Sequence, residues 1–296
     1  RVDRVSSTMK PTHTMLAVLV MAVWASNIVA ARIAAAEIEG WTLITVRMAV
    51  IAITLIPFVG IPRGHMGKLF GLSVTMGTLH FGLMFVALEH IHVGTAALII
   101  QTSVPFALLL ALIFFRERFG WTRAAGIPIC FIGVTMLVGE PRVSDNLLYV
   151  GLALISALAF GAANLQLRGL GDVSVFAING WLAVFSIPQM ALMALLFESG
   201  HVDAVLSAST ETWIAILHMG IVVSIVGHGL WYRLVPKYRT NQTMPFTLLI
   251  PLFGVSFGIV LLRETLTWLI FAGGLVTLAG VAIIVFRKSE NTTVEA

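Results

Sequence analysis

The chain alternates between long apolar runs and short polar breaks. A helix needs roughly 20 mainly apolar residues to cross the hydrocarbon core of a bilayer. The breaks contain turn residues, as in GIPRGHMG from Gly60 to Gly67 and GEPRVSDN from Gly139 to Asn146. Ten runs are long enough, starting near Thr14, Thr42, Lys68, Gly94, Trp121, Leu147, Val173, Glu211, Thr240 and Trp268. The pattern therefore predicts an all-α membrane protein with ten transmembrane helices.

Composition supports lipid as the solvent. Of the 296 residues, 58% are hydrophobic and 11% are charged, against about 25% charged in soluble domains. The net charge of +4 is spread over loops and gathers into no basic face, so nucleic acid is not an expected partner. A single cysteine, Cys130, excludes an intrachain disulfide and a cysteine-rich metal site. No cofactor is predicted.

The basic residues indicate an orientation, because cytoplasmic loops retain Lys and Arg. With the N-terminus in the cytoplasm, most of the 18 Lys and Arg residues fall on the cytoplasmic side. The exceptions are Arg32, Arg47, Arg142 and Arg263. Both termini are therefore expected to be cytoplasmic.

The two halves of the chain are related by duplication. Within one stretch of nineteen positions, seven residues are identical to the residue 147 positions later, more than this composition gives by chance. These are Arg116, Glu117, Trp121, Ala125, Gly126, Gly133 and Val134, matching Arg263, Glu264, Trp268, Ala272, Gly273, Gly280 and Val281. The predicted repeats cover residues 14–140 and 147–287. Because each has five spans, the second must be inverted, as in many secondary transporters. A duplicated scaffold without transport is the alternative.

Several motifs resemble one transporter family. The first half contains WASN from Trp24 to Asn27, FVALEHIHVGTAALI from Phe85 to Ile99, and RERFGW, and the second half repeats RETLTW. These resemble EamA-type proteins of the drug/metabolite transporter superfamily. Among ten-helix members, the length and layout are most similar to the YddG-type aromatic amino acid exporters. That resemblance implies export of aromatic amino acids and related compounds across a bacterial inner membrane.

Polar side chains inside spans are costly and are functional candidates. No Asp or Glu lies near the centre of a span, which disfavours carboxylate-driven antiport of drug cations. The central polar residues are Asn27, His80, Gln101, Asn164, Asn179 and His228. Amides both donate and accept hydrogen bonds, so Asn27, Gln101 and Asn164 suit a zwitterion. The competing interpretation is that they join helices by hydrogen bonds, and it is favoured for Asn179.

The histidines and aromatic residues divide between candidates and structural positions. His80 and His228 lie in equivalent third helices of the repeats. Because a histidine can titrate near neutral pH, they are candidates to couple export to protons or to hydrogen-bond substrate; a packed core histidine is the alternative. Trp24, Phe160 and Trp231 adjoin these positions and are candidate walls for a ring, and Met84 lies one turn from His80. Five further histidines are placed in loops or at span ends, without a ligand cluster: His65, His90, His92, His201 and His218.

Prolines and paired charges suggest moving parts. Pro105, Pro245 and Pro251 interrupt the fourth and ninth spans, where proline permits a kink suited to gating. Arg116-Glu117 and Arg263-Glu264 are candidate latches at opposite ends, with anchoring at lipid headgroups as the alternative.

The sequence thus predicts a transporter that exports small neutral or zwitterionic metabolites, foremost aromatic or other amino acids. Alternating access is expected through a central cavity between the repeats, lined by helices one, three, four, six, eight and nine. The expected partners of the protein are the small-molecule substrate and the lipid bilayer, and the oligomeric state of the protein stays open. Rival functions are broad drug or nucleotide-sugar transport and a membrane-embedded enzyme. An enzyme is disfavoured because the sequence shows no HExxH-type pair and no nucleophile with its base.

Overall fold

The first half of the chain forms five spans. The computed structural model describes residues 9–116, 120–171, 173–234, 237–238 and 243–286. The elements of this half are α1 (Pro11–Ala34), α2 (Gly40–Leu55) with η1 (Ile56–Phe58), α3 (Met66–Leu72) with η2 (Ser73–Gly82) and α4 (Leu83–Leu88), α5 (Val93–Ile99) with η3 (Ile100–Thr102) and α6 (Ser103–Phe115), and α7 (Trp121–Val138). A short helix, α8 (Pro141–Ser144), leads into the second half.

The second half repeats this plan. Its elements are α9 (Leu147–Leu167) with η4 (Arg168–Leu170), α10 (Val175–Phe197), the short α11 (His201–Ser207), α12 (Thr210–Leu217) with η5 (His218–Gly227) and α13 (His228–Leu234), η7 (Met244–Leu248) with α15 (Leu249–Leu262), and α16 (Trp268–Phe286). In the described residues, ten helices are long and apolar enough to span a membrane. Nine begin within three residues of the predicted starts. The ninth begins at Pro245; its predicted start, Thr240, and the predicted repeat end at 287 lie outside the described residues.

Backbone irregularities recur in equivalent places of the two halves. Arg116 and Arg263, 147 positions apart, end α6 and α15 with φ of 52° and 55°, in the left-handed region that terminates helices. The third span of each half contains a ten-residue π-helix, η2 and η5. A 3-10 segment precedes the long part of the fourth and ninth spans. The duplication therefore extends to local backbone geometry.

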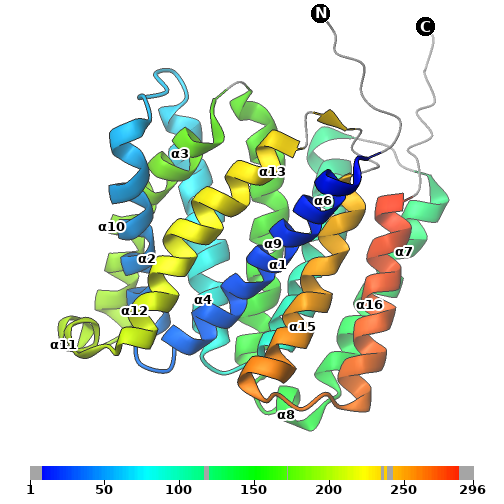
Figure 1. Ribbon diagram of the computed structural model, residues 1–296. Helices are drawn as coiled ribbons and strands as arrows, with labels where there is room; N and C mark the ends of the chain where they lie inside the picture. The colour runs from blue at the N-terminus through cyan, green and yellow to red at the C-terminus, as the bar shows by residue number, and fades with distance from the viewer. Residues whose placement is uncertain (1–8, 117–119, 172, 235–236, 239–242, 287–296) are drawn as a thin grey trace, which may run out of the picture.

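Helix packing follows the same symmetry. The first span packs against the ninth (α1 on α15), and the sixth packs against the fourth (α9 on α6). Likewise η5 packs against α1 as η2 packs against α9. In Figure 1, α15 runs beside α1, and α16 pairs with α7 at the edge of the bundle. The arrangement is two inverted five-helix repeats.

Glycines permit the closest helix pair, α7 with α16. A Cβ on Gly126 would lie 2.7 Å from the carbonyl oxygen of Gly280, and one on Gly133 would lie 2.6 Å from that of Gly273. The duplication relates Gly126 to Gly273 and Gly133 to Gly280. Each glycine thus packs on the counterpart of the other, the self-complementary contact that a two-fold axis requires.

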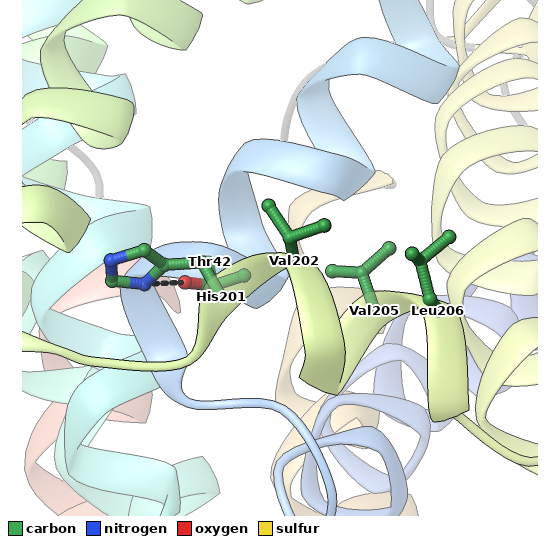
Figure 2. Close-up of a pocket in the computed structure, with 5 residues that line it drawn as sticks. All are labelled: Thr42, His201, Val202, Val205 and Leu206. Carbon is green, nitrogen blue, oxygen red and sulfur yellow. Dashed lines mark hydrogen bonds between the residues drawn. The ribbon is translucent and has the colours of Figure 1, made fainter.

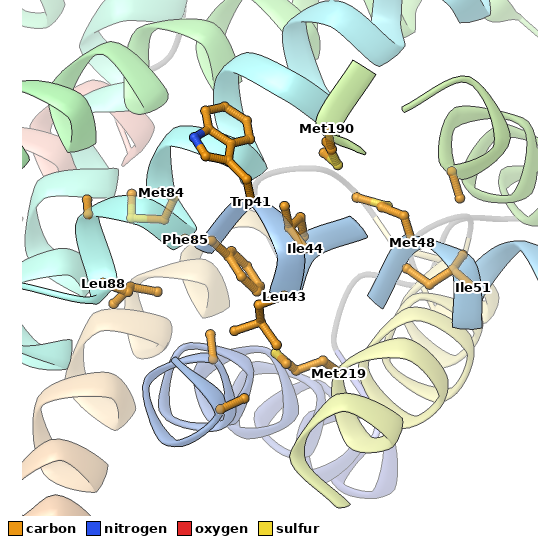
Figure 3. Close-up of a cluster of buried hydrophobic side chains, with 14 of the residues drawn as sticks. Trp41, Leu43, Ile44, Met48, Ile51, Met84, Phe85, Leu88, Met190 and Met219 are labelled. Atoms are coloured by element: carbon orange, nitrogen blue, oxygen red, sulfur yellow. The ribbon is translucent and has the colours of Figure 1, made fainter. Parts of the chain in front are cut away.

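The main hydrophobic core surrounds α2. Figure 3 shows Ile44, Met48 and Ile51 of α2 in one cluster with Met190 of α10 and Met219 of η5. These side chains come from the second, seventh and eighth spans, so the core joins the two halves. With little hydrophobic force between helices in lipid, close packing of such side chains holds the spans together.

Candidate functional site

A stacked column of rings contains two of the predicted site residues. The His80 ring stacks on the Phe160 ring with centroids 4.5 Å apart and an angle of 19° between the planes. The centroid of the Phe81 ring lies 4.7 Å from that of His80. Nδ1 of His80 lies 2.9 Å from Oγ of Ser156, which in turn donates to the His80 carbonyl. His80 lies within π-helix η2, a backbone form often found at functional sites. The column joins the third and sixth spans.

Arg47 extends this column into α2. Its guanidinium carbon lies 4.7 Å from the centre of the Phe81 ring and 5.5 Å from that of Phe85. We predicted Arg47 as one of the basic residues outside the cytoplasm, but it lies seven residues inside α2 and is 2% exposed. The predicted start of this span near Thr42 already placed it within the membrane, and that signal identifies it as a candidate.

A second group of rings lies between α1 and α13. Trp24 contacts His228 with centroids 5.2 Å apart and Trp231 at 5.5 Å. Nδ1 of His228 lies 3.1 Å from the Val223 carbonyl of η5, and Nε1 of Trp24 is buried without a hydrogen-bond partner. These three predicted residues therefore meet at the interface between the first and eighth spans.

The predicted amides are not gathered at one point. Oδ1 of Asn27 is buried without a hydrogen-bond partner. Gln101 is buried in η3 at 9% exposure, and Met84 is buried in α4. Asn164 is exposed and donates through Nδ2 to the Phe160 carbonyl one turn earlier in its own helix, at 2.8 Å. Asn164 makes no hydrogen bond to Asn27 or Gln101 in this conformation. Asn179 has a buried Nδ2 without a partner.

His218 is a correction to the sequence interpretation. It was placed at a span end, but it lies eight residues inside the eighth span, at the start of η5. Its Nε2 is 2.8 Å from the Ser26 hydroxyl of α1. The predicted start of this span, near Glu211, already placed His218 seven residues inside it.

Several polar side chains share a depth in the bundle. We call the capped end the one where α1 ends at Ala34 and α2 begins at Gly40. These side chains lie seven or eight residues from this end of their spans, or about 10–12 Å at the helical rise. They include Asn27, Arg47, His80, Gln101 and, from the second half, His218. A hydrocarbon core is about 30 Å thick, so this polar layer lies roughly a third of the way across.

Carboxylates close the capped end by linking the two halves. Glu198, from the end of α10, accepts hydrogen bonds from the backbone N–H groups of Trp41 and Thr42 at 2.6 and 2.9 Å, and from the Thr42 hydroxyl at 2.7 Å. Glu37 accepts from the Ser209 N–H at 2.7 Å. A carboxylate at a helix N-terminus satisfies free N–H groups and complements the helix dipole.

Glu264 caps the fourth span in the same way. Its oxygens accept from the N–H groups of Val93 at 2.6 Å and Gly94 at 3.1 Å, and His92 lies 3.4 Å away. Burial alone raises the pKa of Glu264, but hydrogen bonds from His92, Gly94 and Val93 outweigh it, and the pKa falls below its ordinary value. Of the two predicted latches, this one joins the halves; Glu117, in the other, lies outside the described residues.

The prolines occupy matched positions. Pro105 is the third residue of α6 and Pro251 the third of α15, and both are buried. Each follows a 3-10 segment, so the backbone of both helices changes form just before the proline. Pro245 is the second residue of the segment before α15. Whether these points act as hinges stays a prediction.

A shallow depression lies away from these residues. It has a volume of about 260 Å³ and is lined by Thr42, His201, Val202, Val205 and Leu206 (Figure 2). In Figure 2 the His201 ring points toward Thr42, and the apolar side chains line one face of α11. A second depression, beside His92 and Glu264, holds about 10 Å³. Neither touches a predicted binding residue, so the central cavity stays a prediction.

Comparisons with known proteins identify the family. The sequence profile of the EamA-like transporter family matches residues 12–139 and again 147–286. A probable amino-acid metabolite efflux pump of Salmonella typhimurium is 30% identical over 92% of this chain and 94% of its own. The Escherichia coli protein of the same description is 27% identical with the same coverage. A probable terminal-alkyne amino-acid exporter of Streptantibioticus cattleyicolor is 26% identical over 75% of this chain and 74% of its own.

A solved structure supports the fold. One crystal structure aligns over 93% of this chain and 96% of its own, with a TM-score of 0.60 and 18% identity. The double match of the family profile agrees with the repeated helix packing. With ten apolar helices, the chain is a multi-pass membrane protein and an EamA-type metabolite transporter rather than an enzyme. The chain belongs to the EamA-like transporter family.

Proposed function

We propose that this transporter exports small neutral or zwitterionic metabolites, foremost aromatic and other amino acids, by alternating access across a bacterial inner membrane. Both termini are cytoplasmic in this proposal, as the distribution of Lys and Arg favours. The capped end then faces outward. The named relatives are probable exporters of amino acids or their metabolites, and they support this substrate class.

The polar layer between the repeats is the observation that carries the proposal. Buried polar groups are normally hydrogen-bonded, yet Oδ1 of Asn27, Nε1 of Trp24 and two nitrogens of Arg47 have no partner. The set includes an acceptor and several donors, as a molecule with both an ammonium and a carboxylate requires. The ring column of Phe81, His80 and Phe160 offers flat surfaces beside it.

The links at the capped end supply a gate. Glu198, Glu264 and Glu37 each join one half of the chain to the other. Rocking of the halves about their common axis must break these links to open that end. We infer that this conformation is closed on the outward side.

Rival cargoes fit the site less well. A drug cation favours a carboxylate inside the spans, and within the described spans the only carboxylate is Glu211, the second residue of the eighth. A nucleotide sugar favours several converging cations, whereas in the described residues Arg47 is the one Lys or Arg side chain of the polar layer.

Counterflow in liposomes tests the function. Purified protein is reconstituted with unlabelled amino acid inside, and uptake of labelled aromatic and aliphatic amino acids is followed with and without a pH gradient. Protein-free liposomes are the control. Uptake of amino acids above this control is expected. Movement of organic cations without movement of any amino acid contradicts the proposal.

A further inference from the structure

Arg47 is a buried cation without a counter-ion. It is 2% exposed, and its Nε and Nη1 have no hydrogen-bond partner. Among the described residues it forms no ion pair. A buried charge is costly unless it is paired and hydrogen-bonded. The described residues therefore provide no anion for this charge.

Aromatic rings pack against the guanidinium of Arg47, but they do not replace its missing hydrogen-bond acceptors. Phe81 and Phe85 lie against it at 4.7 and 5.5 Å. A ring face attracts the charge, but it does not replace the strong acceptors that a guanidinium fork matches. In Figure 3, Phe85 lies among Leu43, Ile44 and Met84, and all of these neighbours are apolar.

The surroundings place Arg47 within the polar layer rather than in an isolated core. Its guanidinium lies over the Phe81 ring, which adjoins His80 of the third span. Its backbone carbonyl lies beside Gly220 of η5. The layer also contains the unpartnered Oδ1 of Asn27. Arg47 is thus positioned where the two halves meet.

We propose that Arg47 binds the carboxylate of the transported molecule and thereby limits the cargo to compounds that carry one. A guanidinium presents parallel N–H donors that match a carboxylate in a bidentate pair, shorter and stronger than a neutral hydrogen bond. The inference rests on the proposed function and adds the group that selects the substrate. Asn27 and Trp24 remain available for the rest of the molecule.

Binding of four related probes tests the inference. The probes are phenylalanine, phenylalaninamide, phenethylamine and 3-phenylpropionate, measured by calorimetry on the purified wild-type protein and on Arg47→Gln and Arg47→Lys. Wild type is expected to bind phenylalanine at least about tenfold more tightly than either probe without a carboxylate, as for loss of a charged hydrogen-bonded pair. Arg47→Gln abolishes this preference, and Arg47→Lys retains part of it because it keeps the charge but not the fork.

Controls separate binding from folding. Arg63→Gln removes the same charge from an exposed loop and should leave the preference unchanged. Size-exclusion profiles and melting temperatures show whether the Arg47 variants are folded; if Arg47→Gln does not fold, the comparison of the four probes on wild type and Arg47→Lys decides. Equal affinity of wild type for phenylalanine and phenethylamine overturns the inference and leaves the proposed function standing. Arg47-dependent binding of 3-phenylpropionate without binding of any amino acid overturns the proposed function and supports the anion site.

Discussion

The Glu198 carboxylate caps the helix that begins beside Thr42, accepting from both the N–H and the hydroxyl of Thr42. Glu198 ends a span of the second half, and Thr42 begins a span of the first. One side chain therefore satisfies free N–H groups and fastens two halves that must separate at this end during transport.

Replacing Glu198 with Gln should weaken this closure. One oxygen is lost as an acceptor, and a hydrogen bond to a charged group contributes about 1.5–3 kcal/mol. We expect the open population to rise roughly tenfold or more. Cys130→Ala gives a cysteine-free background, since the chain has one cysteine, and Met84→Cys, buried near the capped end, is the probe. In intact cells, a thiol reagent that does not cross the membrane should label Glu198→Gln faster.

Asp203 provides a matched control for this experiment. It is an exposed carboxylate near the same end, in α11. In the parent protein, which carries only Cys130→Ala and Met84→Cys, adding Asp203→Asn should leave the labelling rate unchanged. Equal labelling of Glu198→Gln and the parent would show that the capping contact does not hold this end closed.

Glu89 should make closure depend on pH. It accepts from the Gly40 N–H at 2.7 Å. Burial, together with the charges of Glu198 and Glu39, raises its pKa to about 7, while the Gly40 hydrogen bond and Arg32 oppose the rise. If opening returns the pKa to its ordinary value of 4.5, the closed state binds the proton more tightly. Closure is then strongest below pH 4.5, weakens as the pH rises from 4.5 to about 7, and stays constant above about pH 7.

Labelling at a series of pH values checks this dependence. The ratio of the labelling rates of the parent and Glu89→Gln cancels the titration of the probe thiol itself. We expect the ratio to rise from pH 5 and to level off above about 7. A flat ratio would mean that Glu89 does not titrate with closure.

Gly133→Ala should destabilise the protein. The added methyl group would lie 2.6 Å from the Gly273 carbonyl and even closer to the backbone of Thr277. Neither can move without separating α7 from α16, and overpacking costs about 1–3 kcal/mol. Gly151→Ala is the control, because a Cβ there meets nothing within 4 Å and alanine favours a helix by up to about 1 kcal/mol. Thermal unfolding in detergent should give a lower Tm for the first variant only.

His80→Ala and Gln101→Ala should each reduce transport without loss of folded protein. His80 stacks on Phe160 and pairs with Ser156, and Gln101 is a buried amide at the same depth. Loss of one neutral hydrogen bond to cargo contributes about 1 kcal/mol, or roughly a fivefold weaker affinity. Amino acid counterflow measures the effect, and Gly151→Ala is again a suitable control. Unchanged flux in both variants would remove these residues from the site.

The number of spans, and the starting points of most of them, follow from the sequence alone. The thickness of the bilayer sets a minimum apolar length, and each run such as that starting at Trp121 or Trp268 meets it independently of its neighbours. The duplication was also visible, because Gly126 and Gly133 recur as Gly273 and Gly280. An odd number of spans per repeat then required inversion.

Only the tertiary structure decided which residues meet. Lipid and protein interior are both apolar, so these helices carry no amphipathic stripe that marks an inner face. The sequence therefore grouped Asn164 with Asn27, whereas Asn164 bonds within its own helix. It counted Arg47 only as a basic residue outside the cytoplasm and placed His218 at a span end. It also did not connect Glu198 with Thr42, because contacts between distant spans depend on how the helices cross, and hydrophobicity along one chain does not encode that crossing.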